Sequence, residues 1–157
     1  MSTSHFNDLL LLFESLEVKY LVIGGYAVML YTEPRFTKDL DVWVEPSNEN
    51  ASRVFQALAR FGAPLGDVTP SDFTIENQVF QMGVAPVRID VLTTITGVTF
   101  SEAWEARVRR SFLGNPVWFI GRDHLIRNKL ASGRPLDLFD ADNLKLSQAH
   151  PLKEVAE

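Results

Sequence analysis

The residues best suited to metal binding or catalysis lie in segment 37–44, where a single aliphatic residue separates two carboxylates. Asp39 and Asp41 alternate with Leu40 and Val42, and this period of two predicts a β-strand. On a strand, the side chains of residues i and i+2 project from the same face, about 6.5 Å apart along the chain. Two like charges this close repel each other, and a divalent cation between them removes the repulsion. The pair therefore indicates a metal site or, alternatively, a half-exposed strand that carries two acids by chance.

A glycine pair and a third carboxylate accompany this acidic pair. Gly24-Gly25 follows the apolar segment 20–23, which is typical of a buried strand, and precedes a segment long enough only for a short helix. A strand that turns into a helix in this way presents backbone N–H groups to an anion, although a simple tight turn uses the same residues. Asp90 lies in a further alternating segment, 87–93, where it either joins the other acids or lies on an exposed strand face.

In this order along the chain, these residues resemble the nucleotidyltransferase superfamily, whose best-known member is DNA polymerase β. The version with Gly-Gly and Arg-x-Thr-x-Asp-x-Asp is most similar to the bacterial branch that holds abortive-infection toxins of the AbiEii type and small uncharacterised relatives. The resemblance spans residues 20–145, most of the chain. The residues that carry it are Gly24-Gly25, Arg35-x-Thr37-x-Asp39-Leu40-Asp41-Val42, Ile89-Asp90-Val91-Leu92, Lys129 and Arg134-Pro-Leu-Asp137-Leu-Phe-Asp140.

The resemblance implies a two-metal mechanism with three carboxylate ligands. Asp39, Asp41 and Asp90 would hold Mg²⁺ (or Mn²⁺), and Asp90 is also a candidate acceptor of the attacking hydroxyl's proton. Gly24 and Gly25 would bind the triphosphate of the NTP substrate through their backbone N–H groups. These three acids are therefore the predicted metal ligands and catalytic residues.

Four further residues are candidates for nucleotide binding. Arg35 and Lys129 would contact phosphate, the first as a planar fork and the second as a point charge that also counts among the catalytic candidates. Thr37 either hydrogen-bonds near the phosphates or has a structural role at the start of a strand. Asp137 either orients Lys129 by ion pairing or is an acid in a first helical turn, where the helix dipole favours it.

The function implied is transfer of a nucleoside monophosphate from an NTP to a hydroxyl of an RNA or protein acceptor, in a toxin–antitoxin or phage-defence setting. The family's usual His-Gly ahead of Arg35 is replaced by Thr-Glu-Pro, which leaves the acceptor open. Two alternatives remain: a non-catalytic, antitoxin-like regulator that retains the fold, and metal-dependent hydrolysis of phosphodiesters. The second needs the acids but no triphosphate-binding turn.

Hydropathy and breaker residues predict the elements that must position these groups. We expect an α/β (α+β) fold: a small mixed twisted sheet flanked by helices, with a helical C-terminal extension. Residues 1–157 are expected to form a single domain, with a core over about 18–121 and C-terminal helices over about 122–147. The expected strands are 20–23, 39–45, 79–82, 87–93 and 117–120; the expected helices are 6–13, 26–31, 48–61, 101–110, 124–132 and 136–146. Ser47 is the expected N-cap and Gly62 the expected stop of the helix over 48–61, and Asp123 is the expected N-cap of the helix that ends at Gly133.

The composition excludes several kinds of site. The 157 residues contain no cysteine, which rules out disulfides, thiolate metal ligands and cysteine nucleophiles. The three histidines form no HxxxH or HExxH pattern. The uncharged stretch 20–31 is too short to span a bilayer, so we expect a cytoplasmic protein with no membrane partner.

The net charge of −5 argues against a surface that attracts polyanions throughout, but basic residues are concentrated in one segment. Residues 101–135 contain seven Lys and Arg side chains against three acidic ones. Such a segment forms either a groove for RNA or triphosphate, or a solvated helix face. The seven are Arg107, Arg109, Arg110, Arg122, Arg127, Lys129 and Arg134.

Overall fold

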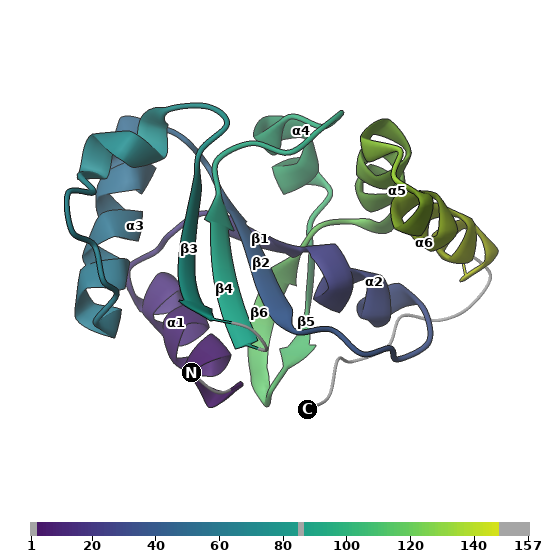
Figure 1. Cartoon of the computed structure of the whole chain (residues 1–157), viewed down its shortest axis with the longest axis horizontal. Helices are drawn as coiled ribbons and strands as arrows, with labels where there is room; N and C mark the ends of the chain where they lie inside the picture. Colours follow the sequence, from purple (N-terminus) through teal and green to yellow (C-terminus); the bar gives the residue numbers. More distant parts are fainter. Residues whose placement is uncertain (1–2, 85–86, 148–157) are drawn as a thin grey trace.

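The computed structural model describes residues 3–84 and 87–147, and its centre is a six-stranded mixed sheet. The strands lie in the order β3-β4-β2-β1-β6-β5 (Figure 1). β2 is antiparallel to β1 and parallel to β4, whereas β1 is parallel to β6; the edges are the antiparallel pairs β3–β4 and β5–β6. This confirms the predicted mixed α/β sheet. The strands are β1 (Tyr20–Ile23), β2 (Asp39–Val44), β3 (Val79–Val84), β4 (Val87–Leu92), β5 (Val108–Phe112) and β6 (Asn115–Phe119).

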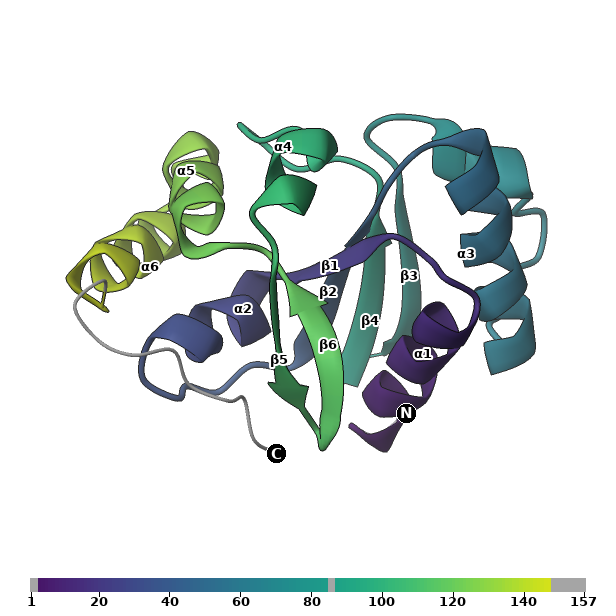
Figure 2. The same ribbon diagram turned by 180° about the vertical axis from the view of Figure 1, so that it is seen from behind.

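Helices lie at both ends of the sheet. Figures 1 and 2 show α1 and α3 at one end of the molecule and the pair α5–α6 at the other, with α2 on the α5–α6 side. Among the described residues, no helix is both long enough and apolar enough to cross a membrane. The helices are α1 (Ser4–Ser15), α2 (Gly24–Tyr31), α3 (Asn48–Phe61), the 3₁₀ turn η1 (Pro70–Thr74), α4 (Phe100–Glu105), α5 (Arg122–Ser132) and α6 (Pro135–Leu146).

The spacing of apolar residues in α1 fixes the face that this helix buries. Phe6, Leu9, Leu10 and Phe13 recur at i, i+3, i+4 and i+7, and each is at most 2 % exposed. The predicted amphipathic helix is thus confirmed. Its apolar face belongs to the same hydrophobic core as the whole of β1. The strand that leads to the glycine pair is therefore held in place by burial in this core.

Asn50, in the first turn of α3, fastens this helix to the strands β1 and β2. Ser47 caps the helix by accepting a hydrogen bond from the Asn50 N–H group at 3.2 Å. The buried Asn50 amide accepts from the Lys19 N–H group at 2.7 Å and donates to the carbonyls of Lys19 (3.1 Å) and Glu45 (2.9 Å). Since Lys19 precedes β1 and Glu45 follows β2, one side chain holds together the two strands that carry the glycine pair and the acidic pair.

Two expectations about the second half of the chain are wrong. The helix predicted over 101–110 ends at Glu105, and residues 108–112 form β5, which pairs with β6. Leu113 (φ 53°) and Gly114 (φ 86°) form the two-residue connection of this hairpin, a backbone geometry that suits tight hairpins. Polar and apolar residues do not alternate clearly in this arginine-rich strand. The helix was therefore predicted from residues that also favour helices. In α5, Gly121 rather than Asp123 is the N-cap, and Asp123 lies in the first turn.

The three hydrogen bonds of the Asn50 amide give a test of this anchoring. We expect Asn50→Ala to lower the free energy of unfolding by about 2–3 kcal/mol, because buried backbone groups beside β1 and β2 would lose their partners. Urea unfolding measures the change. The matched control is Asn48→Ala in the same helical turn, where the side chain is exposed and we expect little effect. Equal losses in the two variants would contradict the anchoring role.

Candidate active site

The parallel pairing of β2 with β4 brings the three predicted carboxylates together. In its register, Asp41 lies opposite Asp90, and Asp39 lies opposite Arg88. Leu40 is fully buried on the other face of β2, as the alternation predicted. The side chains of Asp39 and Asp90 are 32 % and 12 % exposed, so the three acids form a cluster at the rim of the sheet that is open to solvent on one side.

Arg88 compensates part of this negative charge. Its Nη2 lies 3.1 Å from Asp39 Oδ2, and its Nε and Nη2 lie 3.0 and 3.3 Å from the two oxygens of Asp90. Each carboxylate of this bridge is therefore hydrogen-bonded to the same guanidinium, which crosses from β4 to β2. Arg88 was not among the predicted site residues. The available signal was its position two residues before Asp90, which places both side chains on one face of the strand.

Asp41 has no such partner, and its ionisation is correspondingly disfavoured. Burial, together with the charges of Asp90 and Asp39, raises the pKa of Asp41 to about 7, against the opposing charges of Lys129 and Arg88. Burial also raises the pKa of Asp90, although Arg88 opposes this shift. The cluster thus concentrates more negative charge than its neighbours neutralise.

This donor set suits a hard divalent cation. Carboxylate oxygens from three acids on one face are the ligands that Mg²⁺ prefers, and a bound cation would stabilise the ionised form that burial and repulsion disfavour at Asp41. Within residues 3–84 and 87–147, no group of three or more His, Asp or Glu side chains is arranged to hold a metal ion as it stands. Arg88 occupies oxygens of Asp39 and Asp90 that a metal would use, so metal binding requires this bridge to rearrange.

The glycine pair brings the N-terminus of α2 directly against these side chains. Gly24 has a φ of 69°, and a Cβ atom there would lie 2.3 Å from Asp41 Oδ2. A Cβ on Gly25 would lie 2.6 Å from Thr37 Oγ1 and 3.5 Å from the guanidinium of Arg35. Both positions therefore require glycine, one for its conformation and both for space. Among the described residues, no side chain caps α2, so its first N–H groups have no side-chain partner.

A buried ionic network connects the C-terminal helices to this segment. Lys129, on α5, is buried, and its Nζ lies 3.4 Å from Asp137 Oδ1 and 3.3 Å from Asp140 Oδ2 on α6. Asp140 is 1 % exposed and also pairs with Arg35 from the loop before β2. One carboxylate thus holds two of the predicted phosphate-binding cations in place.

Asp137 has both of the roles that the sequence left open. It lies in the first turn of α6 and pairs with Lys129. It also accepts a hydrogen bond from Arg134 Nε at 2.7 Å. Although burial acts in the opposite direction, Arg134 and Lys129 hold the pKa of Asp137 below its ordinary value, so this acid is ionised at neutral pH. Arg134 and Asp140 belong to the Arg-x-x-Asp-x-x-Asp part of the resemblance, but neither was among the predicted site residues; their spacing of three residues on either side of Asp137, from the N-cap into the helix, was the signal.

All nine predicted site residues line two cavities that meet at the acidic pair. The first, of about 600 Å³, is lined by eight of the nine. The ninth, Asp90, lines the second cavity, of about 440 Å³, together with several of the eight. The residues shared by both cavities are Gly24, Asp39, Asp41, Lys129, Arg134 and Asp137. The two volumes are within the range of small-molecule sites.

Most of the basic segment lies elsewhere. Of its seven Lys and Arg residues, Lys129 and Arg134 line these cavities. Arg107 lies between the rings of Trp104 and Trp118, at 3.9 and 4.2 Å from their centres, and Arg109 pairs with Glu14. These contacts hold Arg107 and Arg109 beside the hairpin β5–β6, and neither residue lines the two cavities.

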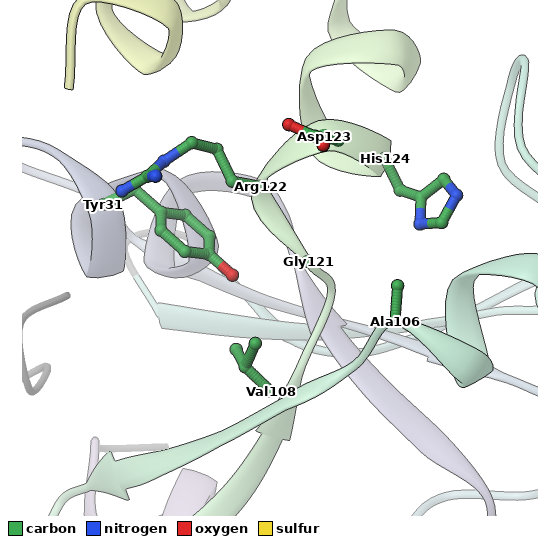
Figure 3. Close-up of a pocket in the computed structure, with 7 residues that line it drawn as sticks. All are labelled: Tyr31, Ala106, Val108, Gly121, Arg122, Asp123 and His124. Carbon is green, nitrogen blue, oxygen red and sulfur yellow. The ribbon is translucent and has the colours of Figure 1, made fainter. Parts of the chain in front are cut away.

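A separate cavity of about 420 Å³ lies where α2, α5 and the β5–β6 hairpin approach one another (Figure 3). The guanidinium of Arg122 lies over the Tyr31 ring at 4.9 Å, while His124 points toward Ala106 on the other side. The Tyr31 hydroxyl donates to the Ile120 carbonyl at 2.7 Å. Asp123 is the one acid that lines this cavity, so it lacks the paired carboxylates of the candidate site.

Paired acids on a central strand, a third acid on the adjacent parallel strand and a glycine turn into a helix define a nucleotidyltransferase. The model of the family described as "nucleotidyltransferase of unknown function (DUF6036)" matches residues 4–156, and the chain belongs to this family. It is therefore an enzyme of nucleotidyl transfer. This confirms the superfamily that the motifs resembled; the AbiEii-type branch stays a prediction.

Solved structures show the same fold. The lincosamide antibiotic adenylyltransferase LnuA, solved with lincomycin bound, is 17 % identical with a TM-score of 0.58, over 92 % of this chain and 97 % of LnuA. A provisionally assigned nucleotidyltransferase (TM1012) from Thermotoga maritima is 11 % identical with a TM-score of 0.60, over 90 % of this chain and 88 % of its own. A search of the curated proteins found no match.

The raised pKa of Asp41 predicts a distinctive pH dependence of stability. Because the folded-state pKa of about 7 exceeds the ordinary value of 3.8, the native state binds this proton more tightly than the unfolded chain does. Asp41 therefore contributes a free energy of unfolding that falls as the pH rises between these two values. We expect Asp41→Asn to match the wild type at pH 4 and to exceed it by about 2 kcal/mol at pH 8, without divalent cations.

Urea unfolding in chelator, at pH values between these limits, measures the difference between the two proteins. The control is Asp142→Asn on α6, where the side chain is exposed and the difference from the wild type should stay constant with pH. A constant difference for Asp41→Asn as well would show that the folded chain does not raise the pKa of this carboxyl.

Proposed function

We propose that this enzyme moves a nucleoside monophosphate from an NTP to a hydroxyl group in a reaction that depends on Mg²⁺ or Mn²⁺. The observation that carries the proposal is the β2–β4 register, which supports a catalytic role for Asp39, Asp41 and Asp90 beside the uncapped start of α2. Family membership supports the type of reaction but leaves the metal and the acceptor open.

The three acids would hold the divalent cation, which supplies positive charge to the triphosphate and lowers the pKa of the attacking hydroxyl. Asp90 is the proposed acceptor of the proton of that hydroxyl, because it lines only the second cavity, whereas Asp39 and Asp41 line both cavities. Arg88 holds Asp39 and Asp90 together before the metal binds.

The remaining residues would bind the triphosphate. Gly24 and Gly25, which carry the first N–H groups of α2, line the first cavity, and the start of a helix attracts anions. Arg35 and Lys129 supply positive charge from fixed positions, since Asp140 pairs with both. Thr37 lies against Gly25, where its hydroxyl is available to a phosphate oxygen.

The acceptor is proposed as a hydroxyl compound, with RNA, protein and small molecules as candidate classes. LnuA is an adenylyltransferase of lincosamide antibiotics, which supports a small molecule for a chain of the same fold. The sequence resemblance to AbiEii-type toxins supports a macromolecule and a toxin–antitoxin or phage-defence role in the cytoplasm. Family membership disfavours the non-catalytic regulator that the sequence left open, and the presence of all nine predicted site residues around the two adjoining cavities agrees with this.

Transfer activity tests the carboxylate assignment. The protein is incubated with each α-labelled NTP and Mg²⁺ or Mn²⁺, with RNA, lysate protein and small hydroxyl compounds as acceptors. We expect Asp41→Asn and Asp90→Asn to reduce transfer at least about 100-fold, and the double variant to lose little more, because the ligands of one cluster act as a unit. Asp142→Asn is the control. Normal turnover in Asp41→Asn would refute the assignment.

Nucleotide binding tests the glycine turn separately from catalysis. Gly25→Val would place side-chain atoms against Thr37 and over the N–H groups of α2, so we expect the affinity for Mg²⁺ with a non-hydrolysable NTP to fall at least about tenfold. Titration calorimetry measures the affinity, and a melting curve checks that the variant folds. The double variant Gly25→Ala, Thr37→Ala relieves the contact with the hydroxyl. Full affinity in a folded Gly25→Val protein would place the triphosphate elsewhere.

A further inference from the structure

The two cavities beside the acidic pair differ in the chemistry of their walls. They share the residues of the junction, where Asp39, Asp41 and Lys129 lie. Beyond it, the first cavity continues along the phosphate-binding segment with Gly25 and Arg35. The second continues on the side of Asp90, between β4, the chain that follows it and α5. We call this second cavity the β4–α5 compartment.

Apart from the paired side chains of Arg88 and Asp90, the walls of the β4–α5 compartment away from the junction are uncharged and rich in hydrogen-bonding groups. Thr94, Thr96, Asn128 and Ser132 line it, together with the apolar residues Ile23, Leu92 and Ile95. Uncharged hydroxyl and amide groups on one side of a cavity suit a ligand that itself carries hydroxyl groups.

Hydrogen bonds hold these walls in place without a ligand. Asn128 Nδ2 donates to the Thr96 carbonyl at 3.0 Å, which joins α5 to the chain after β4. The Ser132 hydroxyl donates to the Asn128 carbonyl at 3.0 Å. Thr94 Oγ1 accepts from the Asn77 N–H group at 2.9 Å. The compartment is therefore built from a helix and an anchored segment, and it does not need to form around the ligand.

The cations at the junction are already neutralised, which disfavours a polyanionic ligand. Arg88 pairs with Asp39 and Asp90, and both Lys129 and Arg134 pair with Asp137. Four acids and three bases line the compartment, a net charge of −1 (three minus four). Nucleic-acid sites instead present unpaired Lys and Arg along a phosphate track.

We propose that the β4–α5 compartment is the acceptor site, and that the acceptor is a small uncharged polyhydroxylated molecule such as a saccharide or nucleoside. Its volume of about 440 Å³ accommodates a molecule of this size, and its neutral hydroxyl and amide groups provide hydrogen bonds for several hydroxyls. This inference rests on the proposed nucleotidyl transfer and specifies its second substrate.

The location also suits the transfer. With the triphosphate bound along the segment that carries Arg35 and Thr37, an acceptor in the compartment would lie on the other side of the acidic pair, beside Asp90. Its hydroxyl oxygen forms the new P–O bond, the bond between the α-phosphorus and the bridging oxygen breaks, and pyrophosphate leaves with that electron pair. The hydroxyl proton passes to Asp90, which lines this compartment.

Filling the compartment tests the proposal. Ser132→Tyr places an aromatic ring among the neutral groups, and Thr96→Tyr does so from the exposed rim if the first variant does not fold. The matched control is Leu130→Tyr on the same helix, where the side chain is 44 % exposed and lines neither cavity. Each protein is incubated with α-labelled NTP, Mg²⁺ and a panel of neutral mono-, di- and trisaccharides and nucleosides, with total RNA and lysate protein in parallel.

We expect label in members of the neutral panel, kcat/KM for that acceptor at least about tenfold lower in Ser132→Tyr, and Leu130→Tyr equal to the wild type. The affinity for Mg²⁺ with a non-hydrolysable NTP, measured by calorimetry, should stay within about twofold in all variants. Label confined to RNA or protein, no label in the panel despite NTP binding, or unchanged transfer in a folded Ser132→Tyr protein would each overturn the proposal. Absence of NTP binding in the wild type would instead refute the proposed function itself.

Discussion

The site depends on one constraint, the pairing of β2 with β4 in a register that sets Asp41 opposite Asp90. Parallel pairing of like charges on neighbouring strands is unfavourable by itself. The chain tolerates it because the opposite faces of both strands are buried in the core, where Leu40, Val42 and Ile89 are fully inaccessible. A slip of one residue would turn these side chains outward, so hydrophobic burial on one face fixes the carboxylates on the other. Arg88 then lowers the electrostatic cost by bonding to two of the three acids.

A second set of charges orients the C-terminal helices. The α5–α6 pair exposes Leu136 and Phe139 on its outer side while it buries Asp137 and Asp140, an inverted polarity for a surface helix. Buried carboxylates are costly unless they are paired, and the cations that pair with them come from three different segments of the chain. These ion pairs fix the position of α6, because Arg35 and Lys129 can reach Asp140 only when α6 lies against α2 and α5.

Helices and strands with a strong periodicity of apolar residues were predicted from the sequence. Those whose secondary structure depends on partners distant in the chain were not. The apolar spacing of α1, the four residues of β1 and the Ser47 and Gly62 boundaries of α3 are local signals, and all were confirmed. Strand β5 was not predicted because its formation depends on pairing with β6 and on the contact of Arg109 with the Trp118 ring, which the local sequence does not show. Similarly, the nine site residues were identified by their resemblance to a superfamily, whereas Arg88 required the strand register.

The proposed acceptor side of the site could not be predicted from the sequence either, because it also depends on segments that are distant in the chain. Triphosphate binding uses a glycine turn and fixed cations, which leave a recognisable spacing in the chain. The β4–α5 compartment is instead made of single threonine, serine and asparagine residues on two unrelated segments, held together by the bond from Asn128 to the Thr96 carbonyl. Such residues form no motif, so no spacing in the chain points to them. A fold that keeps the charge chemistry on β2 and β4 and places selectivity on the adjoining loop and helix can therefore change its second substrate without disturbing its first.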